Sequence, residues 1–151
     1  MDPYQPILNT HIRTLFEDYI DSSNIPEIDY FAIGVQEVTL KKSISLMSRV
    51  EWQKTFTENH FAIHDPIRIA TLNTKHTVFT FDDVDHVNSG GAAIMLERKK
   101  YGIRHGIVLM DRKASHNYML TLATAYSKFK EKDFLVKNRA NLKRIFKVHR
   151  L

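Results

Sequence analysis

The stretch YFAIGVQEVTLKKSISLMS, residues 30–48, determines the type of fold that we expect for this chain. Residues 30–38 are rich in aromatic and β-branched side chains, which predicts a buried strand. Residues 43–48 predict a second strand, and only a short turn around Lys41 and Lys42 separates the two. Because a link this short joins antiparallel neighbours, the stretch predicts a hairpin and a largely antiparallel sheet.

Outward from this hairpin, the sequence predicts three more strands and a set of helices. The strands are expected at residues 78–81, 105–111 and 118–124. Helices are expected where apolar residues recur every three or four positions: from after Pro6 to about 21–24, at 50–60, 66–74 and 92–101, and from 130 onward. The result is an α/β protein in which helices cover one or both faces of a five-stranded sheet.

The length and composition are those of a single globular domain spanning residues 1–151. Hydrophobic residues make up 43% and charged residues 26%, which excludes a disordered chain. The absence of cysteine excludes disulfides, a thiolate metal site and a cysteine nucleophile. No apolar run approaches the roughly 18 residues of a membrane span, and the first residues lack the pattern of a signal peptide. We therefore expect a cytoplasmic location and no membrane contact.

Positive charge is concentrated near the C-terminus. The chain carries a net charge of +5, and residues 128–150 contain nine basic residues against two acidic ones. One interpretation is an amphipathic helix that exposes its charges to water. The other is a surface that attracts phosphates or an acidic protein. No aromatic residues alternate with the basic ones, so we expect no specific DNA binding by this chain alone. Glu in place of Lys143, Arg144 and Lys147 is expected to leave folding nearly unchanged.

Trp52 and Asp65 each have a structural and a functional interpretation. Trp52 lies on the apolar face of a predicted helix, where a lone aromatic residue most often belongs to the core. Asp65 precedes Pro66, and this pair is typical of a helix start that Asp65 caps. The functional interpretation needs both residues: an indole N–H and a carboxylate facing one apolar cavity would fix the two ends of an amide-like head group.

The order of the predicted elements and of several residues resembles the autoinducer-binding domain of LuxR-type quorum-sensing regulators. The resemblance runs from about the first helix to the last. The residues that carry it are Trp52, Phe56, Phe61, Asp65-Pro66, Phe79, Phe81, Tyr101-Gly102-Ile103, Gly106 and Leu120-Thr121-Leu122. It implies an α/β/α sandwich around a central, mostly antiparallel sheet, and the role of a bacterial signal receptor in transcription regulation, without enzymatic activity.

The resemblance also implies a ligand and its contacts. The ligand would be an acyl-homoserine lactone or a related amphipathic signal. Trp52 would donate to the lactone carbonyl, Asp65 would accept from the amide N–H, and Thr121 would contact the acyl carbonyl. Ser48 and Phe56 stand where the family usually has tyrosines, so two phenolic donors are missing. Phe81 would cover the head group. The acyl chain would lie among Ile33, Val35, Leu46, Phe56, Ile69, Leu109 and Leu120.

The sequence shows no convincing metal site, cofactor site or catalytic constellation. His60 and His64 have the i,i+4 spacing of a metal pair, but the predicted helix ends between them and no third ligand follows at fixed spacing. The acidic stretch 82–85 lacks the spacing of a calcium loop. Residues 89–91, Ser-Gly-Gly, lack the context of a phosphate loop and are expected to form a flexible loop and helix entry. We therefore expect no cofactor, no metal and no catalysis.

Two functions remain open at this point. In the first, the chain is a sensor domain that binds its signal between the sheet and the helices that carry Trp52 and Asp65. In the second, it is a ligand-free, stand-alone interaction protein that pairs with a full-length LuxR-type regulator; a homodimer is a further possibility. The second is motivated by the missing phenolic donors and by the end of the sequence at Leu151, before any DNA-binding module. Large side chains between Trp52 and the sheet would favour the second.

Overall fold

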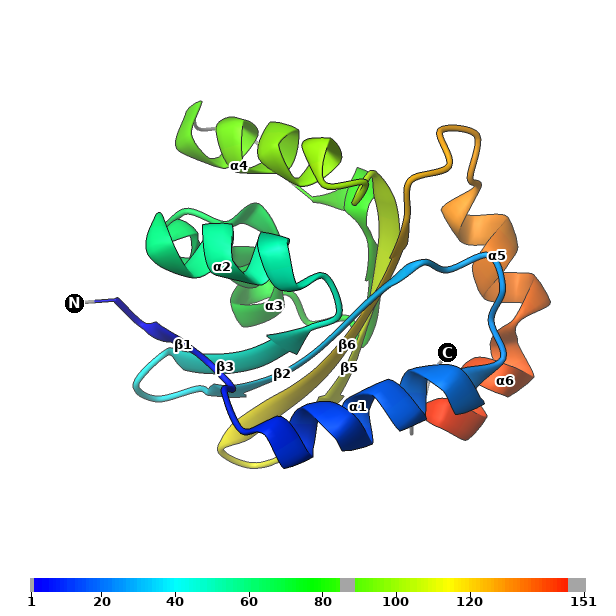
Figure 1. Ribbon diagram of the computed structural model, residues 1–151, viewed down its shortest axis with the longest axis horizontal. Helices are drawn as coiled ribbons and strands as arrows, with labels where there is room; N and C mark the ends of the chain where they lie inside the picture. The colour runs from blue at the N-terminus through cyan, green and yellow to red at the C-terminus, as the bar shows by residue number, and fades with distance from the viewer. Residues whose placement is uncertain (1, 85–88, 147–151) are drawn as a thin grey trace.

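The computed structural model describes residues 2–84 and 89–146, and within them it shows one six-stranded sheet with helices on both faces (Figure 1). The strands are β1 (Tyr4–Pro6), β2 (Tyr30–Glu37), β3 (Lys42–Met47), β4 (Val78–Thr80), β5 (His105–Arg112) and β6 (His116–Thr124). The helices are α1 (Thr10–Ser23), α2 (Val50–Glu58), α3 (Pro66–Asn73), α4 (Ser89–Lys100), α5 (Glu131–Lys137) and α6 (Arg139–Ile145), with short 3-10 helices η1 (Phe61–Ile63) and η2 (Phe81–Asp83).

The strands follow the order β1-β3-β2-β6-β5-β4 across the sheet. β2 pairs with β3 and β5 pairs with β6 through tight turns, and β2 also pairs antiparallel with β6 at the centre. The predicted α/β class and the mostly antiparallel sheet are therefore confirmed. The sequence analysis missed a sixth strand, β1, which pairs parallel with β3. This strand is three residues long and ends in proline, so it lacks the alternating pattern by which a strand is recognised.

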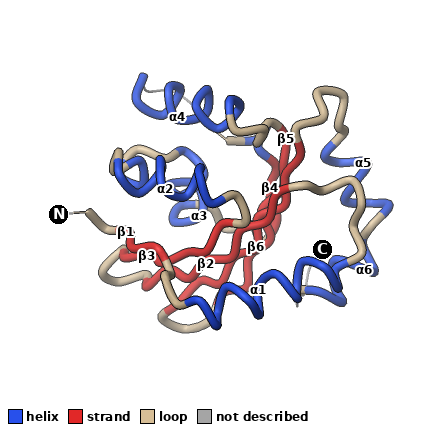
Figure 2. The backbone as a smooth tube through the Cα atoms, viewed as in Figure 1, coloured by secondary structure: helices blue, strands red, loops and turns tan. Residues whose placement is uncertain are grey.

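Each face of the sheet has its own hydrophobic core. Helices α2, α3 and α4 cover one face, where Trp52 and Ile94 belong to the first core. Helices α1, α5 and α6 cover the other face, where Phe16 and Leu142 belong to the second core. Figure 2 shows these two groups of helices on opposite sides of the strands. The molecule is thus the α/β/α sandwich that the resemblance implied.

The alternation of side chains along a strand decides which core each residue joins. On β2, Tyr30 and Ala32 pack in the first core, whereas Phe31 and Ile33 pack in the second. A difference of one position therefore moves a side chain from one face of the sheet to the other.

Asp65 marks the start of a helix, as predicted, and Gly102 marks the end of another. The side chain of Asp65 accepts a hydrogen bond from the backbone N–H of Ile67 at 3.2 Å and caps α3. Gly102 follows α4 with a φ of 78°, a conformation that glycine adopts without strain. The start of α4 differs from the prediction, because residues 89–91 already lie within the helix and do not form a loop.

The predicted C-terminal helix is in fact two short helices, α5 and α6, which meet at Asn138. The exposed Arg144 of α6 reaches the end of α1. Its Nη2 donates to the backbone carbonyl oxygens of Ser22 at 3.3 Å and Ser23 at 2.9 Å. A cation in this position satisfies carbonyls that the helix itself leaves unpaired. Residues 147–151, including the predicted basic residues Lys147 and Arg150, lie outside the described residues.

This contact gives Arg144 a structural role that the other basic residues of the segment were not expected to have. We predict that Arg144→Glu lowers the free energy of unfolding by about 1 kcal/mol or more, because it places a negative charge at the carbonyl end of α1. Lys143→Glu is the matched control, since Lys143 is an exposed neighbour, and it should change the free energy by less than about 0.5 kcal/mol. Urea denaturation of both variants measures this difference, and equal effects would contradict the role given to Arg144.

Candidate ligand-binding site

A cavity of about 80 Å³ lies between the sheet and helices α2, α3 and α4. Strands β2, β3 and β6 form its floor, and one residue of α2, three of α3 and one of α4 form part of its walls. Polar and apolar side chains are mixed along its surface. The lining residues are Tyr4, Tyr30, Ala32, Ile33, Gly34, Gln36, Ser43, Ile44, Ser45, Met47, Phe56, Asp65, Ile67, Arg68, Thr71, Arg98, Met119 and Thr121.

Asp65 and Arg98 form a buried ion pair in the wall of this cavity. Arg98 Nη1 lies 2.5 Å from Asp65 Oδ1, and Arg98 Nη2 lies 2.9 Å from Asp65 Oδ2. The two residues are only 2% and 5% exposed, respectively. Asp65 Oδ1 also accepts the capping N–H of Ile67. The pair therefore joins the start of α3 to the last turn of α4 through a two-pronged, charge-assisted contact.

The guanidinium of Arg98 also packs against two aromatic rings of α2. Its Cζ lies 5.3 Å from the ring centroid of Trp52 and 5.8 Å from that of Phe56, which are cation–π distances. Burial alone would lower the pKa of Arg98, but the adjacent Asp65 carboxylate outweighs burial and raises this pKa above its usual value. Arg98 is thus permanently charged and fully enclosed.

Trp52 is fully buried at the centre of an aromatic cluster on α2. Its ring centroid lies 5.8 Å from that of Phe56, 5.9 Å from that of Phe61 and 5.4 Å from that of Tyr101. Among the residues that the structure describes, no acceptor lies within hydrogen-bonding distance of its Nε1. An indole N–H that is buried without a partner is uncommon in a folded protein and carries a desolvation cost.

A second polar group lines the cavity from β2, β3 and α3. Gln36 Nε2 donates to Thr71 Oγ1 at 2.5 Å, and Thr71 Oγ1 donates to the backbone oxygen of Arg68 at 2.6 Å. Arg68 Nε donates to Ser43 Oγ at 2.9 Å. Burial lowers the pKa of Arg68. This polar wall limits the room for a long hydrocarbon chain.

The structure brings together part of the predicted site. Phe56, Asp65 and Thr121 line the cavity, and Trp52 lies directly behind Phe56 and Arg98. Ile33 borders the cavity but packs mainly in the second core. These positions agree with a site between the sheet and the helices that carry Trp52 and Asp65.

The remaining predicted residues lie elsewhere. Leu46, Leu109 and Leu120 belong to the second core, on the far face of the sheet, and Val35 lines a hollow on that same face beside Phe146. The sheet therefore separates these four residues from the cavity. The sequence did not reveal this placement, because both faces of the sheet are apolar and the hydrophobicity of a strand residue does not show which core it joins.

Three further predicted residues are also placed outside the cavity lining. Ile69 lines a separate surface hollow between α3 and β4. Ser48 extends the β2–β3 pairing, because its Oγ accepts from the backbone N–H of Phe31 at 2.9 Å. Phe81 is buried in the first core, where its ring lies against the position that a Cβ on Gly106 would occupy.

Sequence reasoning missed Arg98. The run Glu97-Arg98-Lys99-Lys100 at the end of a helix is typical of a solvated last turn. A signal was nevertheless present, because Arg98 stands four positions after Ile94, which places both on the inner face of α4.

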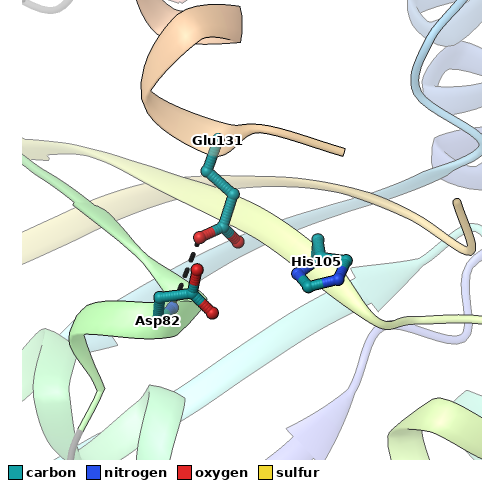
Figure 3. Close-up of side chains that lie close together, drawn as sticks. All are labelled: Asp82, His105 and Glu131. Atoms are coloured by element: carbon teal, nitrogen blue, oxygen red, sulfur yellow. Dashed lines mark hydrogen bonds between the residues drawn. The ribbon is translucent and has the colours of Figure 1, made fainter. Parts of the chain in front are cut away.

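Asp82, His105 and Glu131 form a separate cluster at the start of α5 (Figure 3). One potential metal-binding atom from each lies within 4.8 Å of the others, and side chains of these types bind zinc. However, Glu131 Oε2 already accepts the backbone N–H of Gly106 at 2.6 Å, and Oε1 accepts that of Asp82 at 3.4 Å. The cluster therefore has a structural explanation as a clasp that fixes α5 to β5 and η2.

The structure also places His60, whose spacing to His64 was considered above, and part of the acidic stretch 82–85. His60 Nδ1 contacts Asp2 Oδ2 at 2.7 Å, which gives this histidine a carboxylate partner near the N-terminus. Asp83 caps η2 by accepting from the backbone N–H and the hydroxyl of Thr80. Asp85 lies outside the described residues.

The fold agrees with the comparison to known proteins. Residues 13–147 match the autoinducer binding domain family, and the chain belongs to that family. No curated protein sequence matches the chain. The family is non-enzymatic, and LuxR-type domains of this kind take part in quorum-sensing transcription regulation. The resemblance recognised in the sequence is therefore confirmed.

Three solved structures share the fold at low sequence identity. CepR2 from Burkholderia cenocepacia, an N-acylhomoserine lactone dependent LuxR family transcription factor, is 15% identical over 88% of this chain and 79% of its own, with a TM-score of 0.69. SdiA, a protein of Escherichia coli, in complex with octanoyl-rac-glycerol, is 14% identical over 88% of this chain and 56% of its own, with a TM-score of 0.67. The ligand-binding domain of VqsR from Pseudomonas aeruginosa is 10% identical over 91% of this chain and 94% of its own, with a TM-score of 0.57.

The described helices include none with the length and apolar composition needed to cross a membrane.

The clasp at Glu131 predicts a pH dependence of stability. Burial, together with the nearby Asp82 carboxylate, raises the pKa of Glu131 from 4.5 to about 7. Between these values the folded protein holds a proton that the unfolded chain has lost, so the stabilisation is present at low pH and is lost as the pH rises through 7. From about pH 5 to pH 7.5 the wild type should lose on the order of 1 kcal/mol more unfolding free energy than Glu131→Gln.

The control for this measurement is Glu58→Gln, which removes an exposed carboxylate and should follow the wild-type curve. Chemical denaturation across the pH range provides the comparison. If the unfolding free energies of the wild type and of Glu131→Gln change with pH in parallel, the Glu131 carboxyl group does not titrate between about pH 5 and pH 7.5.

Proposed function

We propose that this domain senses a small amphipathic signal, an acyl-homoserine lactone or a related acyl compound, in the cavity between the sheet and α2–α4. The observation that carries the proposal is the fully buried Trp52 Nε1, which has no acceptor among the described residues and lies beside the cavity-lining Phe56 and Arg98. Leaving such a donor unpaired costs about 1–3 kcal/mol, which a ligand carbonyl oxygen would recover.

The similar solved structures support an acyl ligand. CepR2 is described as dependent on an N-acylhomoserine lactone, and SdiA was solved with octanoyl-rac-glycerol. Both compounds join an acyl chain to a small head group rich in oxygen. The charged pair of Asp65 and Arg98 and the hydroxyl of Thr121 line the present cavity, and the buried donor of Trp52 lies against its wall residues Phe56 and Arg98.

The size of the cavity requires that side chains move when a ligand binds. Its volume of about 80 Å³ is well below the roughly 300–1,000 Å³ typical of small-molecule sites. The lining of β2, β3 and α3 ends in the polar group of Gln36, Arg68 and Thr71. The domain should therefore bind signals with short acyl chains more tightly than signals with long ones.

The small volume of the cavity supports a second candidate function. Arg98 and Phe56 pack against Trp52, and the cavity that remains is only about 80 Å³, so the domain has a nearly complete core without a ligand. A domain of this kind would act by pairing with a LuxR-type regulator, in a way that does not depend on a signal molecule.

Binding measurements separate the two functions. We predict that N-octanoyl-homoserine lactone or 1-octanoylglycerol raises the thermal unfolding midpoint of the wild type, and that native mass spectrometry detects one bound molecule. Ala32→Leu should abolish the shift, because Ala32 lines the cavity and the larger side chain fills it. Ala93→Leu, an identical change on the exposed face of α4, should retain it.

Absence of a shift and of bound mass with a panel of acyl chain lengths, for a wild-type protein that unfolds cooperatively, would contradict the sensor function. Recovery of a defined complex between this ligand-free protein and a purified LuxR-type regulator would then support the second candidate.

A further inference from the structure

We infer that Arg98 occupies the position at Asp65 that a ligand N–H donor would need, and that the site therefore selects acyl compounds whose linking group offers oxygen acceptors and no N–H. An ester meets this requirement and an amide does not. The inference rests on the proposed function, because it concerns the chemistry of the ligand that enters the same cavity.

Asp65 already accepts hydrogen bonds from within the protein on both of its carboxylate oxygens. Oδ1 receives Arg98 Nη1 at 2.5 Å and the backbone N–H of Ile67 at 3.2 Å, and Oδ2 receives Arg98 Nη2 at 2.9 Å. Arg98 neutralises the carboxylate, and both groups are removed from water. These three bonds leave about one of the roughly four lone-pair positions of the carboxylate open, on Oδ2, and a ligand amide that takes it competes with the Arg98 guanidinium.

The polar groups of Arg98, which contacts Asp65, and of Trp52, which packs against Arg98, are hydrogen-bond donors. A guanidinium has five N–H groups and accepts no hydrogen bond, and an indole donates only. A ligand group that binds next to Arg98, or to Trp52 Nε1, which has no partner among the described residues, therefore has to be an oxygen acceptor. The hydroxyl of Thr121 also lines the cavity, but a neutral hydroxyl accepts a weaker hydrogen bond than a carboxylate does.

An amide and an ester of the same acyl chain differ only in the linking group, which is N–H in the first and oxygen in the second. An amide that enters this site leaves its N–H without a strong acceptor, or else breaks the ion pair and leaves a buried charge partly unpaired. An ester with oxygen in place of N–H has neither penalty. Arg98 is thus a specificity-determining residue, which acts by taking the acceptor that an amide would use.

The experiment compares N-octanoyl-homoserine lactone with the octanoyl ester of α-hydroxy-γ-butyrolactone, in which an oxygen atom replaces the N–H. Calorimetry measures both compounds against the wild type, Arg98→Met and Arg98→Lys. The wild type should bind the ester at least about fivefold more tightly than the amide, which corresponds to one unpaired ligand donor. Arg98→Met releases Asp65 and should reverse the preference. Arg98→Lys removes the two-pronged contact but keeps the charge, and it should shift the ratio toward the amide.

The matched control is Lys99→Met, the same change at the exposed neighbouring position, which should keep the wild-type ratio. Tighter binding of the amide by the wild type would overturn the inference and support the proposed function. Binding of the amide by an Arg98 variant, with neither compound bound by the wild type, would support the inference and contradict the proposed function. An unchanged ratio in both Arg98 variants, or no binding by any protein, would overturn the inference.

Discussion

The ion pair between Asp65 and Arg98 is the interaction on which the helical layer over the cavity depends. Asp65 caps the start of α3, Arg98 extends from the last turn of α4, and the guanidinium packs on Trp52 and Phe56 of α2. The contacts of this one ion pair therefore join α2, α3 and α4. Because a buried charge that lacks its partner is strongly destabilising, the three helices are held in a mutual arrangement that leaves a small cavity above the sheet.

This arrangement has consequences for how a signal would enter. The polar centre of the site is internally neutral, so the domain needs no ligand to balance the charge of Asp65. What remains unsatisfied is a donor, Trp52 Nε1. A molecule that offers oxygen acceptors completes the site while the ion pair stays in place, and a molecule that must use Asp65 competes with a charged partner already bound to the protein. A receptor whose carboxylate is not paired with an arginine would have no such competition for a ligand N–H.

The sequence allowed much of the fold to be predicted because local signals were strong. The short link at Lys41 and Lys42 set the first hairpin, and the Asp65-Pro66 pair set the start of α3. The site could be predicted only in part, since Leu46 and Leu120 are as apolar as true cavity residues but lie on the other face of the sheet. No pattern distinguishes two buried faces when both are hydrophobic. Nor does a basic last turn of a helix reveal that one of its arginines is paired with a carboxylate 33 residues away.

The most direct test of this account is a double-mutant cycle on the ion pair, with Asp65→Asn, Arg98→Met and the double variant measured by chemical denaturation. Asn retains the capping oxygen, so the cycle isolates the charged contact from the cap of α3. The account predicts that each single change lowers the unfolding free energy markedly and that the double variant recovers about 2–3 kcal/mol relative to the sum of the two. Additive effects, with a coupling below about 0.5 kcal/mol, would contradict it and would mean that the charged contact does not hold the three helices together.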